Sequence, residues 1–468
     1  MTAPRRAIGF GDLVLFYIVT GISLRWIATA ATAGPSAVTI WLVAWLAFYV
    51  PLALSVVELS SRHPEEGGLY LWSKRAFGDF AGFMTGWAYW TCNLPYYPSI
   101  LYFTAGNALF LGGSRWAGLG SSPGYFIGFS LAGLALATGV NLAGLRIGRW
   151  LHNVGAIGTW LPIALLLGMA AVALSRFGSA TSFSAPALVP HASVKDMVFW
   201  STIVFALGGS ESASFMGDEI KNARRNLPRA LLVAGILVTT GYILGTVAIL
   251  VTLPRGEVNG LEGIMQAIAR GADRLGVPGL IPGAALLITL SNLGAVGAWF
   301  AASARIPFVA GLDRFLPAAF GRLHPRWDTP HVAILVQAAL GALFIFLGQA
   351  GTSVKGAYDV LVSMGVITYF VPYVFLFGAM IRLQSVPAGP GVFRVPGGRS
   401  VAVALAALGL ATTLATIGLS VLPPPDEPNK LLAVVKIVGL SGLLLGAGVV
   451  VYAGGKGRRI EERVRGER

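Results

Sequence analysis

Long apolar runs recur along the whole of this 468-residue chain and constrain its fold more than any other feature. Twelve runs have roughly the 20 residues that a helix needs to cross a hydrocarbon core about 30 Å thick. They cover approximately residues 9–32, 38–61, 77–105, 123–145, 148–175, 196–217, 228–253, 279–309, 329–348, 356–381, 399–422 and 430–454. Membrane β-barrels show instead short segments in which apolar and polar residues alternate. The runs therefore predict an all-α polytopic membrane protein with about 12 transmembrane helices.

The composition agrees with a single transmembrane domain over residues 1–468 and excludes an ordinary water-soluble protein. Only 12% of the residues are charged, whereas soluble domains average about 25%. Cys92 is the single cysteine, so an intrachain disulfide and a cysteine-based metal cluster are both excluded. The five histidines are scattered and form no metal-binding pattern. We expect no metal site and no cofactor.

An excess of basic residues gives a formal charge of +14 and predicts the orientation of the chain in the membrane. In a soluble protein this charge would suggest a nucleic-acid partner, but membrane proteins concentrate basic residues on the cytoplasmic side. With the N-terminus inside, 24 basic residues fall on the cytoplasmic side and nine on the opposite side. We therefore predict a cell-membrane protein with both termini in the cytoplasm and no nucleic-acid partner. The basic tail 455–468 is either an anchor on anionic headgroups or a plain solvated tail.

Polar residues interrupt the apolar runs 9–32 and 196–217 near their midpoints. The interrupting segments are Val19-Thr20-Gly21-Ile22-Ser23-Leu24-Arg25 and Phe205-Ala206-Leu207-Gly208-Gly209-Ser210-Glu211-Ser212. An interrupted helix frees backbone groups at mid-membrane, where a transporter needs polar atoms to bind its solute. Close helix packing explains either glycine-containing segment alone better than a binding site does. Their paired positions, as the first spans of two five-span units of opposite topology, favour a binding site.

Three longer stretches carry the similarity of this chain to a known family. They are Glu58–Tyr70 leading into Arg75–Trp87, Gly209–Ser214 followed by Glu219–Ala230, and Ser303–Pro330. Together they cover most of residues 9–382. In these stretches the chain resembles the amino acid–polyamine–organocation (APC) superfamily of transporters, and bacterial amino acid permeases and exchangers in particular.

The resemblance implies a LeuT-like fold, a five-plus-five inverted repeat in which helices 1 and 6 are discontinuous. The repeats would cover about 9–175 and 196–382, with two further helices at about 399–454. The substrate would lie between spans 1, 3, 6 and 8, bound at one end by backbone groups of Thr20, Gly21, Ile22 and Ser23 and at the other by Phe205, Gly208, Gly209 and Ser210. The resemblance also places Trp299 on the pocket wall and Phe205 as an aromatic gate. For both rings the alternative is packing in the core or against lipid.

Three further side chains are predicted to take part in coupling or gating. Arg25 departs from the apolar residue of the family pattern, and a mid-span arginine needs a partner. That partner is either an anionic group of the substrate or an ion-paired Glu211 or Asp12, and we favour the ion pair. Glu211 is our proton-linkage residue because burial favours the protonated carboxyl group; the alternative is a fixed structural role. Thr159 falls where some proton-coupled family members carry a lysine, so a hydroxyl there could instead contribute to a sodium site.

We therefore predict a secondary active transporter that moves amino acids across the cytoplasmic membrane by alternating access, either ion-coupled or by exchange. Its partners would be a small-molecule substrate, the lipid bilayer and a coupling proton or sodium ion. The alternative is a transporter of polyamines or other organic amines; Arg25 would repel the charge of a polyamine if it were exposed to the site. An enzyme is not expected, because the sequence has no Gly-x-Ser-x-Gly, His-Glu-x-x-His or phosphate-loop motif. A channel is not expected either, because there is no filter-like repeat.

Overall fold

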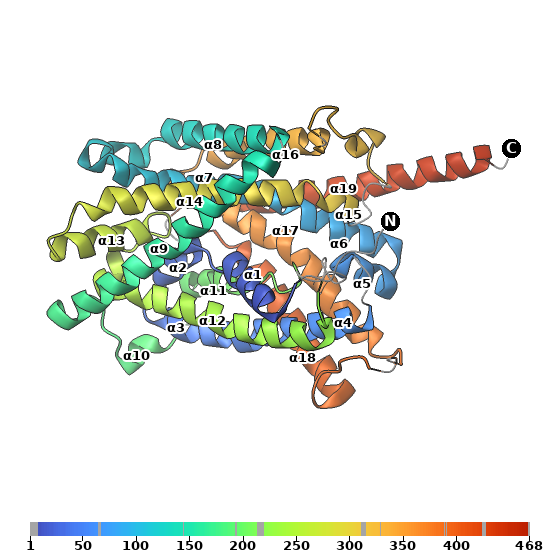
Figure 1. Cartoon of the computed structure of the whole chain (residues 1–468), viewed down its shortest axis with the longest axis horizontal. Helices are drawn as coiled ribbons and strands as arrows, with labels where there is room; N and C mark the ends of the chain where they lie inside the picture. The colour runs from blue at the N-terminus through green and yellow to red at the C-terminus, as the bar shows by residue number, and fades with distance from the viewer. Residues whose placement is uncertain are drawn as a thin grey trace.

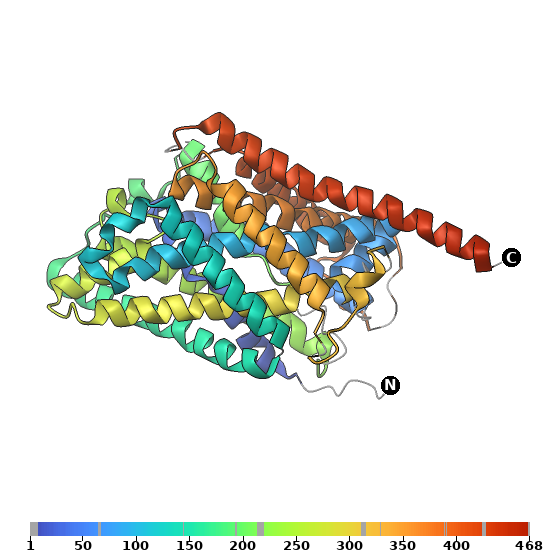
Figure 2. The same ribbon diagram turned by 90° about the horizontal axis from the view of Figure 1, so that it is seen from above.

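The computed structural model describes a bundle of helices in residues 8–63, 67–143, 145–191, 194–212, 220–309, 315–327, 329–387, 389, 391–423 and 427–466. Extended pairing in this part of the chain is limited to one isolated bridge, between Ile8 and Ile220. Most helices run lengthwise side by side, and the last helix extends beyond the rest of the bundle at the C-terminal end (Figures 1 and 2). The predicted all-helical polytopic class is confirmed.

Nine helices within the described residues are long and apolar enough to cross a membrane. They are Ser36–Arg62 (α3, Ser36–Ala44, joined through the π turn Trp45–Tyr49 to α4, Val50–Arg62), α8 (Pro123–Ala143), Trp160–Phe177 of α9 (Leu145–Phe177), α12 (Ala223–Thr252), α14 (Leu280–Ser303), α16 (His331–Gln349), α17 (Val354–Leu383), α18 (Gly398–Ser420) and Lys430–Gly455 of α19 (Lys430–Gly466). Each coincides with one of the predicted runs. The total of twelve spans stays a prediction.

The other three predicted runs contain interrupted helices. Run 9–32 forms α1 (Phe10–Gly21) and α2 (Leu24–Ala31), and run 196–217 forms α11 (Val194–Ala206), followed by irregular backbone as far as Ser212. The predicted discontinuity of helix 1 is therefore confirmed. α11 also ends inside run 196–217, and the residues after Ser212 in which helix 6 would resume lie outside the described part of the chain.

Run 77–105 forms two helices joined by a bend. A turn at Cys92 divides it into α6 (Asp79–Thr91) and α7 (Asn93–Ala108). The amide of Asn93 donates to the carbonyls of Tyr89 and Trp90, at 3.1 Å each. Pro95 has no N–H with which to continue the α6 hydrogen-bond ladder. Side-chain amides and prolines of this kind bend helices without ending them.

Shorter helices lie in the connections between the long ones. They are α5 (Gly68–Phe77), α10 (Ala185–Leu188), α13 (Gly263–Arg274) and α15 (Ile306–Val309), with 3₁₀ turns at Leu109–Leu111, Gly113–Arg115, Ala117–Ser121, Arg255–Glu257 and Ala318–Gly321. The amphipathic helices α5 and α13 bury one face each. Neither is long enough to span a bilayer.

The interrupted helices lie inside the bundle, against helices that hold them in place. α1 and α2 both pack on α12, and α11 packs between α2, α3, α17 and α18. α17 passes through the middle of the bundle (Figure 1) and also contacts α5, α6 and α7. Both chain interruptions are thus surrounded by protein, as a break at membrane depth requires.

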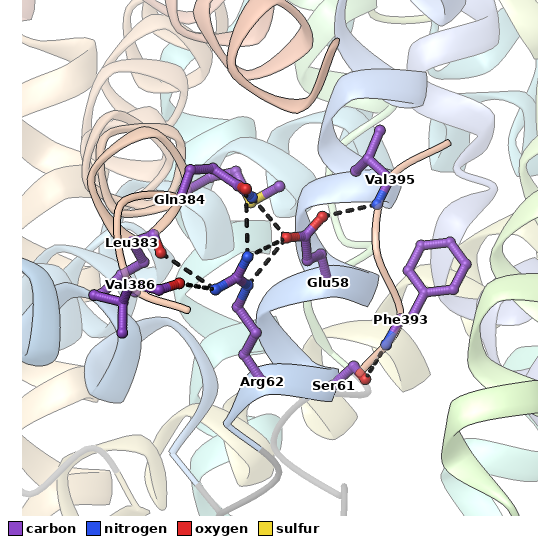
Figure 3. A network of polar contacts seen from close by, with 9 residues as sticks. Glu58, Ser61, Arg62, Leu383, Gln384, Val386, Phe393 and Val395 are labelled. Atoms are coloured by element: carbon purple, nitrogen blue, oxygen red, sulfur yellow. Dashed lines mark hydrogen bonds and ion pairs between the residues drawn. The ribbon is translucent and has the colours of Figure 1, made fainter. Parts of the chain in front are cut away.

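A buried polar network ties the end of α4 to the end of α17 and to the segment before α18 (Figure 3). Glu58 accepts hydrogen bonds from Arg62 Nε (3.0 Å) and Nη2 (2.8 Å) and, through Oε2, from the backbone N–H of Val395 (2.8 Å). Arg62 Nη1 donates to the carbonyls of Leu383 (3.2 Å) and Val386 (3.0 Å). Glu58, which lies inside the predicted span 38–61, therefore has a structural role away from the interrupted helices.

Candidate functional site

The break between α1 and α2 is held open by a tyrosine of the neighbouring helix α12. Ile22 and Ser23 are extended, with φ/ψ of −97°/123° and −126°/127°. The Tyr242 hydroxyl donates to the Gly21 carbonyl (2.6 Å) and accepts from the Ser23 N–H (3.1 Å), so one residue stabilises both sides of the break. Its ring stacks on Trp41 at 4.5 Å. The fold therefore stabilises the break, because the Gly21 carbonyl and the Ser23 N–H, which face α12, are both hydrogen-bonded.

The break after α11 depends on two glycines. Gly208 N–H still bonds to the Phe205 carbonyl (3.1 Å), and then Gly209 turns the chain with a φ of 105° that favours glycine. A Cβ on Gly208 would lie only 2.7 Å from a ring carbon of Tyr369. Ser212 donates from its backbone N–H (3.1 Å) and its hydroxyl to the Gly209 carbonyl, which closes the turn.

Helix ends of opposite polarity meet at these two breaks. α2 begins at Leu24, so its first turn presents N–H groups without intrahelical partners. α11 ends at Ala206, where the Val204 and Phe205 carbonyls accept from the N–H groups of Leu207 and Gly208, and this end carries the negative pole of the helix dipole. The N-terminus of a helix attracts anions and the C-terminus attracts cations. A zwitterion therefore fits between them, with its carboxylate at α2 and its ammonium group at α11.

A cavity of about 140 Å³ lies at this junction. An apolar cavity of about 150 Å³ holds a benzene molecule, so a small or medium amino acid is the right scale of ligand. The lining consists of Tyr17, Thr20, Gly21, Ser23, Trp26, Tyr49, Tyr89, Cys92, Asn93, Tyr96, Phe205, Ala206, Leu207, Gly208, Gly209, Ser210, Ser212, Ala234, Val238, Trp299, Ile306, Gly365 and Tyr369. No charged side chain belongs to this set of described residues.

Most of the residues predicted to bind substrate line this one cavity. They are Thr20, Gly21, Ser23, Phe205, Gly208, Gly209, Ser210 and Trp299. Ile22 does not line it: its side chain is buried and points to α12, where a Cβ on Gly241 would lie 3.0 Å from Ile22 Cδ1. Thr159 belongs to α9, in a stretch whose side chains fall outside the described residues.

Aromatic rings cover the cavity on the side of α2 and α7. Trp26 meets Phe205 edge-on at 5.1 Å, and Phe205 meets Tyr369 edge-on at 5.0 Å. Tyr96 of α7 lies 6.2 Å from Trp299 of α14. Phe205 and Trp299 are thus two of several rings that line the cavity, and the sequence analysis had named only those two.

Glu211 lies directly behind the cavity and is fully buried. It accepts hydrogen bonds from three tyrosine hydroxyls: Tyr89 (3.2 Å), Tyr369 (3.1 Å) and Tyr373 (2.7 Å). The Gly209 N–H also points to its Oε2 (3.2 Å). Tyr89 and Tyr369 also line the cavity, so the hydroxyl groups of these two residues lie between the cavity and the carboxyl group of Glu211.

Arg25 has a different environment from the one we favoured. Its Nη1 donates to the Ser99 hydroxyl (2.6 Å), and its guanidinium carbon lies 3.9 Å from the Trp26 ring centre and 5.0 Å from that of Tyr96. Glu211 is occupied by tyrosines, and Asp12 accepts from the Gly9 N–H at the start of α1. The expected ion pair of Arg25 with Glu211 or Asp12 is therefore wrong. Aromatic faces and a hydroxyl took the place of a carboxylate.

Sequence reasoning missed the tyrosines of the site. Tyr17, Tyr89, Tyr96 and Tyr369 line the cavity, and Tyr373 holds Glu211 from behind. A usable signal was present, because Tyr369 and Tyr373 are four residues apart in an apolar run and so share one helix face. Buried tyrosines in such a run need hydrogen-bond partners, and Glu211 was available.

The chain is similar to known transporters over most of its length. The family model described as amino acid permease matches residues 7–443. An uncharacterized transporter of Legionella pneumophila is 28% identical over 452 residues, which cover 95% of this chain and 96% of that protein. A probable agmatine/putrescine antiporter of Lactococcus lactis is 24% identical, over 79% of this chain and 78% of its own length. A branched-chain amino acid permease of Bacillus subtilis is 24% identical, over 84% of each chain.

Proposed function

This chain belongs to the amino acid permease family, and from that premise we propose that it is a secondary active transporter of amino acids. The family and the relatives are transporters, so the protein is a multi-pass membrane transporter and not an enzyme. The observation that carries the choice of substrate is the uncharged cavity between the start of α2 and the end of α11. Opposite helix ends satisfy both charges of an amino acid backbone.

The runner-up, a polyamine or other organic amine, fits this cavity less well. A polyamine carries two or more positive charges and no carboxylate, so the N–H groups at the start of α2 would face no anion. Its second ammonium group would need an acidic side chain in the lining, and the described lining has none. The relatives include proteins named for each substrate class. The cavity chemistry favours the amino acid.

Transport by alternating access would use the two interrupted helices as the moving parts. In this proposal α1, α2, α11 and the neighbouring helices rock against α7 and α14, and the inverted repeats 9–175 and 196–382 supply the symmetry of the two states. The driving force would be an ion gradient or exchange of one amino acid for another. Both termini would lie in the cytoplasm, as the distribution of basic residues indicates.

Glu211 would link transport to a proton. It is fully buried, it contacts the break after α11, and two of its tyrosine donors line the cavity. Protonation would remove the charge that the hydroxyls of Tyr89, Tyr369 and Tyr373 stabilise. Since Tyr369 and Tyr373 belong to α17 and Glu211 follows α11, the protonation state would alter how these helices are held together.

The first test is thermal stabilisation of the purified protein by amino acids, decarboxylated amines and polyamines, with and without sodium. A ligand that binds only the folded state adds about 2.7 kcal/mol of stability at a hundredfold excess over its Kd. We expect a shift with neutral amino acids and a smaller one with amines. Stabilisation by polyamines alone would refute the proposed substrate class, and a shift that needs sodium would argue against proton coupling.

Uptake into proteoliposomes tests the role of Glu211. The Glu211→Gln variant should bind the substrate but lose the dependence of uptake on an imposed pH gradient. Tyr373→Phe, which keeps the carboxyl group and removes one of its donors, should alter the pH dependence without abolishing it. Normal uptake by Glu211→Gln with an unchanged pH profile would exclude proton linkage at this residue and leave sodium coupling or exchange.

A further inference from the structure

Arg25 is a buried cation with no anionic partner among the residues that the structure describes, and the site proposed above does not use it. The residue is only 2% exposed. Its contacts are the Ser99 hydroxyl and the faces of Trp26 and Tyr96, and its Nε has no hydrogen-bond partner among the described residues. A buried charge normally has a partner of opposite sign. Its positive charge is therefore only partly compensated by ring quadrupoles and one hydroxyl.

The rings of Trp26 and Tyr96 separate this charge from the cavity. Trp26 and Tyr96 both line the cavity, and both have the guanidinium group of Arg25 over one face, at 3.9 and 5.0 Å. A ligand group in contact with the cavity side of these rings would lie on the order of 8–10 Å from the charge, given van der Waals contacts of about 3.5–4 Å. No charged side chain in the described lining intervenes.

Two physical effects then act on the charge of a ligand. The field of Arg25 raises the energy of a cation and lowers that of an anion at this end of the cavity. In a medium with an effective dielectric constant of about 20, two unit charges on the order of 10 Å apart change a binding constant roughly tenfold. The charge of Arg25 also opposes the cation–π attraction that the cavity-side faces of Trp26 and Tyr96 would offer to a substrate cation, because it lies over the other faces of the same rings.

We propose that Arg25 is a specificity-determining residue that acts through the aromatic wall, disfavouring substrates with a positively charged side chain and favouring net-neutral amino acids. The inference rests on the proposed transport of amino acids and adds the charge class of the substrate. Arg25 need not touch the ligand. The same charge reinforces the start of α2, one residue away, as the end of the cavity that takes the carboxylate.

The test compares norleucine with lysine, which have the same carbon chain and differ by the ammonium group. Binding of each to the purified full-length protein is measured by calorimetry, and the readout is the ratio of the two Kd values. Wild type should bind norleucine more tightly by tenfold or more. Arg25→Gln should reduce that ratio roughly tenfold, whereas Arg25→Lys, which keeps the charge, should retain most of it.

Ser99 provides matched variants that leave Arg25 in place. Ser99→Ala removes the hydrogen bond but not the charge, so the ratio should stay as in wild type. Ser99→Asp places a carboxylate beside the guanidinium group, and the ratio should fall toward that of Arg25→Gln. Ser99→Asp therefore tests the effect of the Arg25 charge on substrate selectivity even if Arg25→Gln does not fold.

An equal change in both affinities in Arg25→Gln and Ser99→Asp, with the ratio unchanged, would show a purely structural role and overturn the proposal. Wild-type protein that binds lysine as tightly as norleucine would overturn it too. Failure of wild type to bind any amino acid would instead refute the proposed function, and the inference with it.

Discussion

Replacement of Glu58 by glutamine should destabilise the protein strongly, although Glu58 is far from the substrate cavity. The side chains of Glu58 and Arg62 are only 1% and 8% exposed. Glu58 Oε1 accepts from Arg62 (2.8 Å) and from the side-chain amide of Gln384 (2.6 Å), and Oε2 accepts from the Val395 N–H. All of its neighbours are donors (Figure 3). A glutamine would point its own NH₂ group at one of them.

The structure allows the cost to be estimated. Glu58→Gln leaves Arg62 buried without a counterion, and breaking a buried pair from one side costs about 3–5 kcal/mol. The carbonyls of Leu383 and Val386 would still accept from Arg62 Nη1, which places the expected loss within that range rather than above it. With an unfolding entropy of about 2.1 cal/mol/K per residue, a chain of this length would lose roughly 3–5 °C in Tm.

The assay is thermal unfolding in one detergent at one scan rate, because unfolding of large proteins is often irreversible. Glu257→Gln is the matched control: it removes the same charge from an ion pair with Arg270 (2.6 Å) whose side chains are 50% and 45% exposed. Exposed pairs contribute about 0.2–1 kcal/mol, so the control should shift Tm by about 1 °C or less.

A double variant, Glu58→Gln with Arg62→Gln, removes both charges and should be less destabilised than the sum of the single variants. Equal shifts in Glu58→Gln and Glu257→Gln would refute the reasoning, because burial would then have no influence on the strength of the pair. Additive single effects would show that Glu58 and Arg62 do not stabilise each other.

Three further predictions follow from individual contacts. Tyr242→Phe leaves the Gly21 carbonyl and the Ser23 N–H without their partner. Each buried unpaired group costs about 1–3 kcal/mol, so the variant should lower Tm by a few degrees and weaken substrate binding in the thermal-shift assay. Gly208→Ala places a Cβ 2.7 Å from the Tyr369 ring and should reduce substrate affinity tenfold or more in calorimetry. Gly139→Ala in α8, which is outside the cavity lining and whose Cβ meets nothing within 4 Å, should have the smaller effect. Burial raises the pKa of Glu262, at the start of α13, above its ordinary value of 4.5. The folded state therefore favours the protonated carboxyl group, and the stability that this protonated group contributes is present below pH 4.5 and is lost as the pH rises toward the folded-state pKa. Glu262→Gln should accordingly raise Tm at pH 7, and the difference in Tm should disappear on acidification.

Local properties of the chain determined the class of fold and the positions of the two main breaks. Apolar runs of about 20 residues favour membrane helices whatever their neighbours are. Glycines mark both breaks in the sequence. Gly209 turns the chain with a φ of 105° that favours glycine, whereas Gly21 precedes two extended residues, Ile22 and Ser23, that are held by Tyr242. Together with the family resemblance, these breaks predicted a set of residues of which most line one cavity: Thr20, Gly21, Ser23, Phe205, Gly208, Gly209, Ser210 and Trp299.

Only the tertiary structure decided how the charged and hydroxyl groups pair. Glu211 bonds to Tyr89 and Tyr373, which are 122 and 162 positions away, and Arg25 bonds to Ser99, 74 positions away. Hydropathy and spacing report the neighbours of a residue along its own helix, but they contain nothing about which face of another helix packs against it. The sequence therefore predicted that Arg25 needs a partner, and helix packing determined that aromatic rings and a serine would provide it.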